Sequence, residues 1–175
     1  MRALVYRGKN DLRIETVPVP KIKPDELLVK VAVCGVCPTD IKKIQYGTVP
    51  PPRIFGHETA GTIVKIGSRV NRLASGRSPG LGDRVGLHHH VPCLKCHVCQ
   101  HRAFAQCETY KRTGITAGFE PAGGGYAEYC AVDARHCLPV PKGVSLRDAS
   151  GLPETFFTVW SNIFMGVGLR AGETL

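Results

Sequence analysis

The sequence lacks the long apolar segments that mark secretion or membrane insertion. Its N-terminus, residues 1–8, has no apolar core of a signal peptide. No uninterrupted apolar run in the 175 residues reaches the length of a membrane span. We therefore expect a cytoplasmic protein without a membrane partner, whose eight cysteines serve as metal ligands and free thiols.

Acidic residues are scarce beside basic ones, with 14 Asp and Glu against 23 Lys and Arg and a net charge of +9. A basic surface can attract nucleic acid, but these Lys and Arg residues are scattered and form no stripe. We expect no nucleic-acid partner. Attraction to an anionic cofactor or substrate explains the charge equally well.

The sequence also lacks a dinucleotide-binding motif. No G-x-G-x-x-G follows a strand, and no acidic residue stands downstream to bind a ribose. The run Gly123-Gly124-Gly125 opens no helix and is predicted to be a turn. The chain therefore has no complete coenzyme domain of its own.

Four cysteines between residues 93 and 107 follow C-x2-C-x2-C-x7-C spacing: Cys93, Cys96, Cys99 and Cys107. Thiolates at this spacing can surround one Zn²⁺ tetrahedrally, which leaves no open position and predicts a structural metal. A disulfide knot needs a secretory context. A ferredoxin-type cluster has Pro after its last Cys, where this chain has Glu108.

Short β-rich runs with Gly and Pro between them dominate the first 140 residues and predict a mainly β fold, a partly open β-barrel. One helix is expected at residues 39–46, ended by Gly47. Residues 71–82 read as a loop. The strands are expected at 2–7, 12–17, 26–33, 58–66, 83–88, 126–132 and 137–140.

The spacing of apolar residues becomes helical near the end of the chain. Ser145 is the expected N-cap of a short helix at 146–150, with Asp148 as the acid of a capping box. Pro153 then opens a second helix over 154–167. Its apolar residues recur with helical spacing and predict a buried stripe of Phe156, Val159, Trp160, Ile163 and Phe164.

A second group of metal-binding residue types lies outside the cysteine loop. Cys37 precedes the first helix and His57 precedes a strand, and three such ligands with one open position make a catalytic zinc site. Asp40 can accept the other ring N–H of His57. Alone, Cys37 would be a buried thiol and His57 a core histidine; their occurrence together favours a metal site.

Five motifs, in this order along the chain, resemble the zinc-containing medium-chain alcohol dehydrogenases. The resemblance covers essentially the whole chain and implies a GroES-like domain at 1–150. It makes 151–175 a connecting helix that leads into a missing Rossmann domain. The motifs are Gly35-Val36-Cys37-Pro38-Thr39-Asp40, Gly56-His57-Glu58-Thr59-Ala60-Gly61, Gly82-Asp83-Arg84-Val85, the four-Cys loop and Gly124-Gly125-Tyr126-Ala127-Glu128-Tyr129.

The resemblance implies hydride transfer between an alcohol and NAD or NADP through a zinc-bound alkoxide, with an alcohol or an aldehyde or ketone as substrate. It further implies a homo-oligomer for a full-length protein, and an inactive chain without the coenzyme domain. It places the catalytic zinc on Cys37 and His57, the proton relay on Thr39, and Glu58 beside the metal. Glu154 falls nearest to the third ligand position, and Thr158 falls where the family contacts the nicotinamide. The structural zinc falls on the four cysteines of the loop.

Some features depart from this pattern and leave alternatives open. Residues 151–158 also resemble the zinc-free quinone reductases of the same superfamily, in which this glutamate is no ligand. Lys42 stands where many members have a relay histidine, and the loop at 68–81 is long for the family. A non-catalytic zinc-binding scaffold is a third possibility. The tract 88–90 is either a metal site or the end of a strand, and the remaining cysteines are expected to be buried thiols: Cys34, Cys130 and Cys137.

Overall fold

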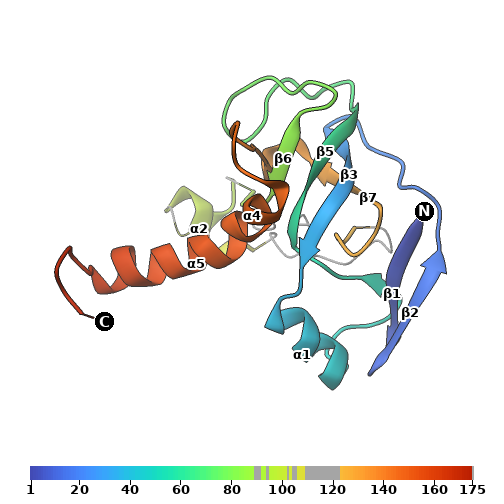
Figure 1. Ribbon diagram of the computed structural model, residues 1–175, viewed down its shortest axis with the longest axis horizontal. Helices are drawn as coiled ribbons and strands as arrows, with labels where there is room; N and C mark the ends of the chain where they lie inside the picture. The colour runs from blue at the N-terminus through green and yellow to red at the C-terminus, as the bar shows by residue number, and fades with distance from the viewer. Residues whose placement is uncertain (89–91, 94, 102, 104–105, 109–122, 175) are drawn as a thin grey trace.

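The strands form two open sheets, as Figure 1 shows for a computed structural model that describes residues 1–88, 92–93, 95–101, 103, 106–108 and 123–174. A three-stranded sheet has the order β2-β1-β4, and a five-stranded sheet has the order β7-β3-β5-β6-β8. Every pairing in them is antiparallel. The strands are β1 (Arg2–Gly8), β2 (Asp11–Thr16), β3 (Glu26–Gly35), β4 (Arg53–Ile54), β5 (Glu58–Ile66), β6 (Arg84–Leu87), β7 (Tyr129–Asp133) and β8 (Cys137–Pro139).

The larger sheet carries the main core. Leu27 and Val29 alternate along β3 with less buried neighbours and face the same cluster as Val85 and Leu87 of β6. Alternation of this kind is the expected signature of a sheet with one buried face. The mainly β fold with short helices is therefore confirmed, and the sheets stay open rather than closing into a complete barrel.

Helix α1 (Pro38–Tyr46) begins soon after β3 and has Cys37, one of the candidate metal ligands, as its N-cap residue. Pro38 lies in its first turn, where a missing N–H costs nothing. Gly47 ends the helix in the left-handed conformation, with φ of 66°, and its N–H binds the Lys43 carbonyl. This helix was predicted to within one residue.

The C-terminal helices form one continuous helical run rather than the two separate helices expected. Ser145 caps α4 (Leu146–Gly151), and its hydroxyl accepts the Asp148 N–H at 3.0 Å, as predicted. Gly151 and Leu152 stay helical, so Pro153 lies inside the run and opens no new helix. The run continues as η4 (Leu152–Phe156), α5 (Phe157–Trp160) and η5 (Ser161–Val167), where η4 and η5 are wider π-helical turns.

The predicted buried stripe on this helix is wrong for this chain. Phe156 is 53% exposed and Trp160 46% exposed, while Ile163 is half-buried. Figure 1 shows why: α5 runs away from both sheets, and apart from the edge contact of Phe157 with His88 little of the described chain covers it. The spacing predicted a helix with one apolar face correctly, but it could not predict what packs against that face.

Two short helical segments complete the described structure, namely α2 (His97–Gln100) in the cysteine loop and η3 (Ala134–His136) between β7 and β8. No helix among the described residues combines the length and hydrophobicity needed to cross a membrane. His88 follows β6 directly, as a strand end should. His89, His90 and Leu175 lie outside the described residues.

Candidate metal centres

The four loop cysteines come together in space. Their sulfur atoms all lie within 4.8 Å of one another, and no disulfide joins them. Backbone N–H groups of Cys93 and Cys96 point at the sulfurs of Cys107 and Cys93 at 3.3 Å, which favours thiolates. Helix α2 contributes by turning the chain between Cys96 and Cys99.

The donor set fits zinc. A tetrahedral ion with Zn–S bonds of about 2.3 Å places its sulfurs about 3.8 Å apart. Cys93 Sγ and Cys99 Sγ lie 4.0 Å apart, near that value and well beyond the roughly 2.05 Å of a disulfide bond. Among the described residues, this is the one group of three or more potential ligands with its donor atoms so close together.

Cys37, Thr39 and His57 form the second centre. The Thr39 hydroxyl lies 3.2 Å from Cys37 Sγ and 3.5 Å from His57 Nε2. Cys37 caps α1 at its N-terminus, and His57 immediately precedes β5, so the end of β3 and the start of β5 bring them together. Cys37 is half-buried and Thr39 exposed, which leaves this centre open on one side.

Asp40 fixes the imidazole of His57. Its Oδ2 lies 3.3 Å from His57 Nδ1, and the two side chains are 1% and 3% exposed. The Asp40 carboxylate therefore lies beside Nδ1 of the ring, while Nε2 faces the Thr39 hydroxyl at 3.5 Å. Burial favours the neutral ring, but Asp40 and Cys37 outweigh it, so the pKa of His57 lies above its ordinary value. Because a metal binds the neutral ring, a metal at Nε2 would compete with protonation of His57.

Glu58 lies beside this centre and connects it to the C-terminal helices. Its Oε1 accepts a hydrogen bond from the Thr155 hydroxyl at 2.8 Å. Its other oxygen occupies the space that a side chain at residue 35 would need, which explains the glycine there. Thr155 was not predicted as a site residue, because no motif marks it and its partner is 97 residues away.

The remaining predicted site residues lie on the helical run. Glu154 is half-buried on η4, and no group of close donor atoms joins it to Cys37 and His57. Thr158 is exposed on α5, where its carbonyl accepts the Asn162 side-chain amide at 2.8 Å. The ligand role of Glu154 and the coenzyme role of Thr158 stay predictions.

A pocket of about 340 Å³ opens where the helical run meets β6 and β8. It is almost wholly apolar, and His88 supplies the polar ring in its wall. The ring of Phe157 meets that of His88 edge-on, with centroids 6.1 Å apart. The lining residues are Gly86, His88, Leu138, Pro139, Val140, Pro141, Ala149, Leu152, Pro153 and Phe157.

Comparison with known proteins matches residues 23–142 to the alcohol dehydrogenase GroES-like domain. A sorbitol dehydrogenase from Bombyx mori is 33% identical over 155 residues, which are 86% of this chain and 42% of that protein. The chain thus spans less than half the length of this relative.

Two solved structures resemble the fold. An alcohol dehydrogenase zinc-binding domain protein from Burkholderia ambifaria has a TM-score of 0.80 at 27% identity, over 99% of this chain and 50% of that one. Acetophenone reductase from Geotrichum candidum in complex with NAD has a TM-score of 0.73 at 28% identity, over 87% of this chain and 43% of that one.

Proposed function

Because the chain belongs to the alcohol dehydrogenase GroES-like domain family, we propose that it is the catalytic domain of a zinc-dependent alcohol or polyol dehydrogenase. The enzyme transfers hydride between a small alcohol, or its aldehyde or ketone, and NAD or NADP. Residues 1–150 are the catalytic domain, and residues 151–175 lead into a coenzyme domain. The sorbitol dehydrogenase relative and the NAD complex of acetophenone reductase support this substrate and coenzyme class.

One observation carries the proposal, namely the contact of the Thr39 hydroxyl with both Cys37 and His57 above a buried Asp40. A thiolate and a neutral imidazole Nε2 are preferred zinc ligands. Asp40 stands at Nδ1, on the other side of the ring from Nε2, and would orient the imidazole for a metal bound at Nε2. A purely structural histidine would have no need of a thiol and a hydroxyl at its other ring nitrogen.

The side chains of this centre have separate tasks. Cys37, His57 and Glu154 would hold a zinc ion, and its chemistry there would be to lower the pKa of an alcohol substrate. Thr39 moves the alcohol proton outward through its exposed hydroxyl. Asp40 keeps the proton on His57 Nδ1. Glu58 adds negative charge beside the centre, and Thr158 contacts the nicotinamide.

The cysteine loop has a structural task. Its four sulfurs occupy all positions of a tetrahedral ion and leave none for substrate. Zinc at Cys93, Cys96, Cys99 and Cys107 therefore holds the loop in shape and takes no part in the reaction.

The test is the zinc content per chain of the wild type and of Cys37→Ala, with Cys34→Ala as the matched control. Cys34 lies on the same segment, but burial raises the pKa of its thiol to about 12, so it is no thiolate. We expect two zinc ions in the wild type and in Cys34→Ala, and one in Cys37→Ala. One ion in all three proteins would reject the dehydrogenase and favour the quinone-reductase-like or scaffold alternative.

A further inference from the structure

Two hydrogen bonds attach η4 to the sheet at the residues on either side of Glu154. The carbonyl of Pro153 accepts a bond from His88 Nδ1 at 2.9 Å. The hydroxyl of Thr155 donates to Glu58 Oε1 at 2.8 Å. Glu154 lies between these two attached residues, so both bonds restrict its backbone position.

Both anchors lie at the same end of the same pair of strands. β5 and β6 pair antiparallel, and the last pair at this end is Thr59 with Leu87. Glu58 and His88 are the next residue on each strand, so they stand side by side at the sheet end. His57 comes immediately before Glu58, which places the anchors next to one ligand of the second centre.

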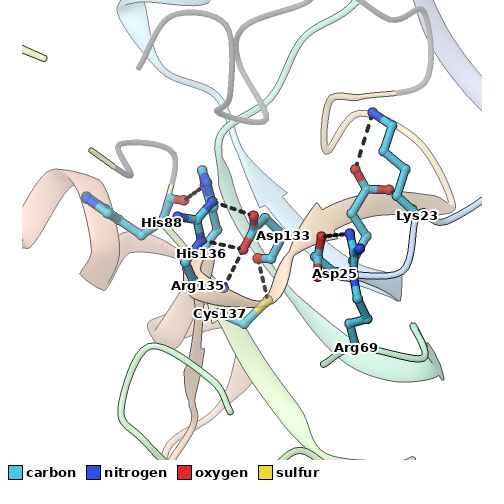
Figure 2. Close-up of polar contacts among 9 residues, drawn as sticks. Lys23, Asp25, Arg69, His88, Asp133, Arg135, His136 and Cys137 are labelled. Atoms are coloured by element: carbon cyan, nitrogen blue, oxygen red, sulfur yellow. Dashed lines mark hydrogen bonds and ion pairs between the residues drawn. The ribbon is translucent and has the colours of Figure 1, made fainter. Parts of the chain in front are cut away.

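His88 is itself firmly held. Its N–H donates to the His136 carbonyl at 2.7 Å, and His136 Nδ1 donates to the His88 carbonyl at 2.9 Å, a contact drawn in Figure 2. The ring of His136 is 1% exposed. Because a carbonyl only accepts, the bond to Pro153 also fixes the proton of His88 on Nδ1.

The two bonds attach a segment whose helix geometry is irregular. The π-helical turn over Leu152–Phe156 is wider than an α-helix, and such turns are frequent at functional sites. Proline at 153 removes one backbone donor from that turn. The bonds from His88 and to Glu58 attach this turn to the sheet in addition to its remaining backbone bonds.

We propose that His88 and Thr155 are positioning residues that fix Glu154 relative to Cys37 and His57. This rests on the proposed function, in which Glu154 is the third ligand. Neither residue touches the reacting atoms. They act by holding the backbone on both sides of the glutamate against the strands that carry His57 and Glu58.

In the experiment, the cysteine loop of the full chain is first filled with Zn²⁺, and the chain is then titrated with Co²⁺. The visible absorption of the Co²⁺ bound as the second ion reports its coordination. Thr155→Val removes the hydroxyl at constant shape, and Thr155→Ser retains it. We expect Thr155→Val to weaken the second ion by about 3- to 10-fold, the range of one hydrogen bond. Thr155→Ser should bind as the wild type does.

Two further variants separate positioning from general damage to the fold. In a Glu154→Gln background, Thr155→Val should have no additional effect, because its action passes through Glu154. His88→Phe keeps a ring against Phe157 but removes the bond to Pro153, and it should also weaken the second ion while the loop ion stays bound.

The outcomes are distinct. Unchanged affinity for the second ion in Thr155→Val would overturn the positioning role, and so would equal losses of that affinity in Thr155→Val and Thr155→Ser. Neither result would contradict the proposed two-metal enzyme. An undiminished effect of Thr155→Val in the Glu154→Gln background would overturn it as well. A wild type that binds a single ion would overturn the proposed function, and the positioning role with it.

Discussion

His136 is a buried histidine held in its neutral form. Burial, the largest influence, lowers its pKa to about 4, although the charge of Asp133 opposes this. An unfolded histidine takes up its proton near pH 6.5. Between pH 6.5 and 4, His136 is therefore protonated in the unfolded chain but neutral in the folded chain. The free energy of unfolding consequently falls as the pH falls.

We expect this one residue to remove about 3 kcal/mol of unfolding free energy between pH 7 and 4. Urea unfolding across that range measures it in the wild type and in His136→Asn, whose amide can replace the Nδ1 donor to His88. The variant should lose less stability on acidification. Parallel pH profiles for the two proteins would show that His136 is protonated in the folded state as well.

Residue-level prediction succeeded where neighbours in the sequence share a task. Asp40 lies one helical turn after Cys37, in the motif that predicted it as the partner of His57, and its carboxylate lies 3.3 Å from His57 Nδ1. Thr155 could not be, because its role depends on Glu58, which only the fold brings near. The ligand role of Glu154 is likewise a matter of distance between segments that sequence patterns do not encode.

At the scale of elements, α4 depends on the N-cap residue that precedes it, Ser145. Ser145 accepts the Asp148 N–H and donates its own hydroxyl to Asp148 Oδ2 at 2.7 Å. The reciprocal contact thus joins two side chains, where a capping box would use the backbone N–H of the cap. The cap secures the helix that continues into η4 and carries Glu154.

We predict that Ser145→Ala costs about 1 kcal/mol of unfolding free energy, the usual value for loss of an N-cap. Ser161→Ala, in the middle of the same helical run, is the control and should cost less than half as much. Denaturant unfolding of the metal-loaded chains provides the comparison. Equal losses of unfolding free energy in Ser145→Ala and Ser161→Ala would mean that the N-cap hydrogen bond contributes no measurable stability.

Element boundaries were predictable wherever a chemical signal marked them. Gly47 ended α1 and Ser145 began α4 as expected, because left-handed glycine and N-cap serine have local physical causes. β7 begins at Tyr129, three residues later than expected, since pairing with β3 rather than composition sets its start. Pro153 was misjudged, because tertiary contacts keep it within a continuous helix.

The whole molecule presents an unusual surface along its last helix. No charged residue occurs from 155 to 169, although the chain carries a net charge of +9. The rings of Phe156, Trp160 and Phe164 stack along one side, with centroids 5.9 and 4.4 Å apart. Exposed apolar surface of this kind favours association with other protein surfaces.

We therefore expect this chain to self-associate with rising concentration, and Trp160→Glu to shift the equilibrium toward monomer by at least about tenfold. Sedimentation velocity at protein concentrations from about 1 to about 100 μM, the range of micromolar dissociation constants, measures the change. Ile14→Glu, which replaces another exposed apolar residue on β2, serves as the control and should leave association unchanged. Equal effects of the two substitutions would point to net charge rather than to the helix surface.

The strand order has a consequence for how the molecule is made. β3 is synthesised early, but its Lys30 pairs with Tyr129 of β7, which is made about 100 residues later. Leu87 of β6 likewise pairs with Cys137 of β8, which is made afterwards. Until then, both strands present bare edges on which a neighbouring nascent chain can pair. Pairings so distant in sequence also close slowly. Newly synthesised copies are thus most vulnerable to aggregation after β6 has been made and before β7 and β8 appear, the strands that pair with these edges.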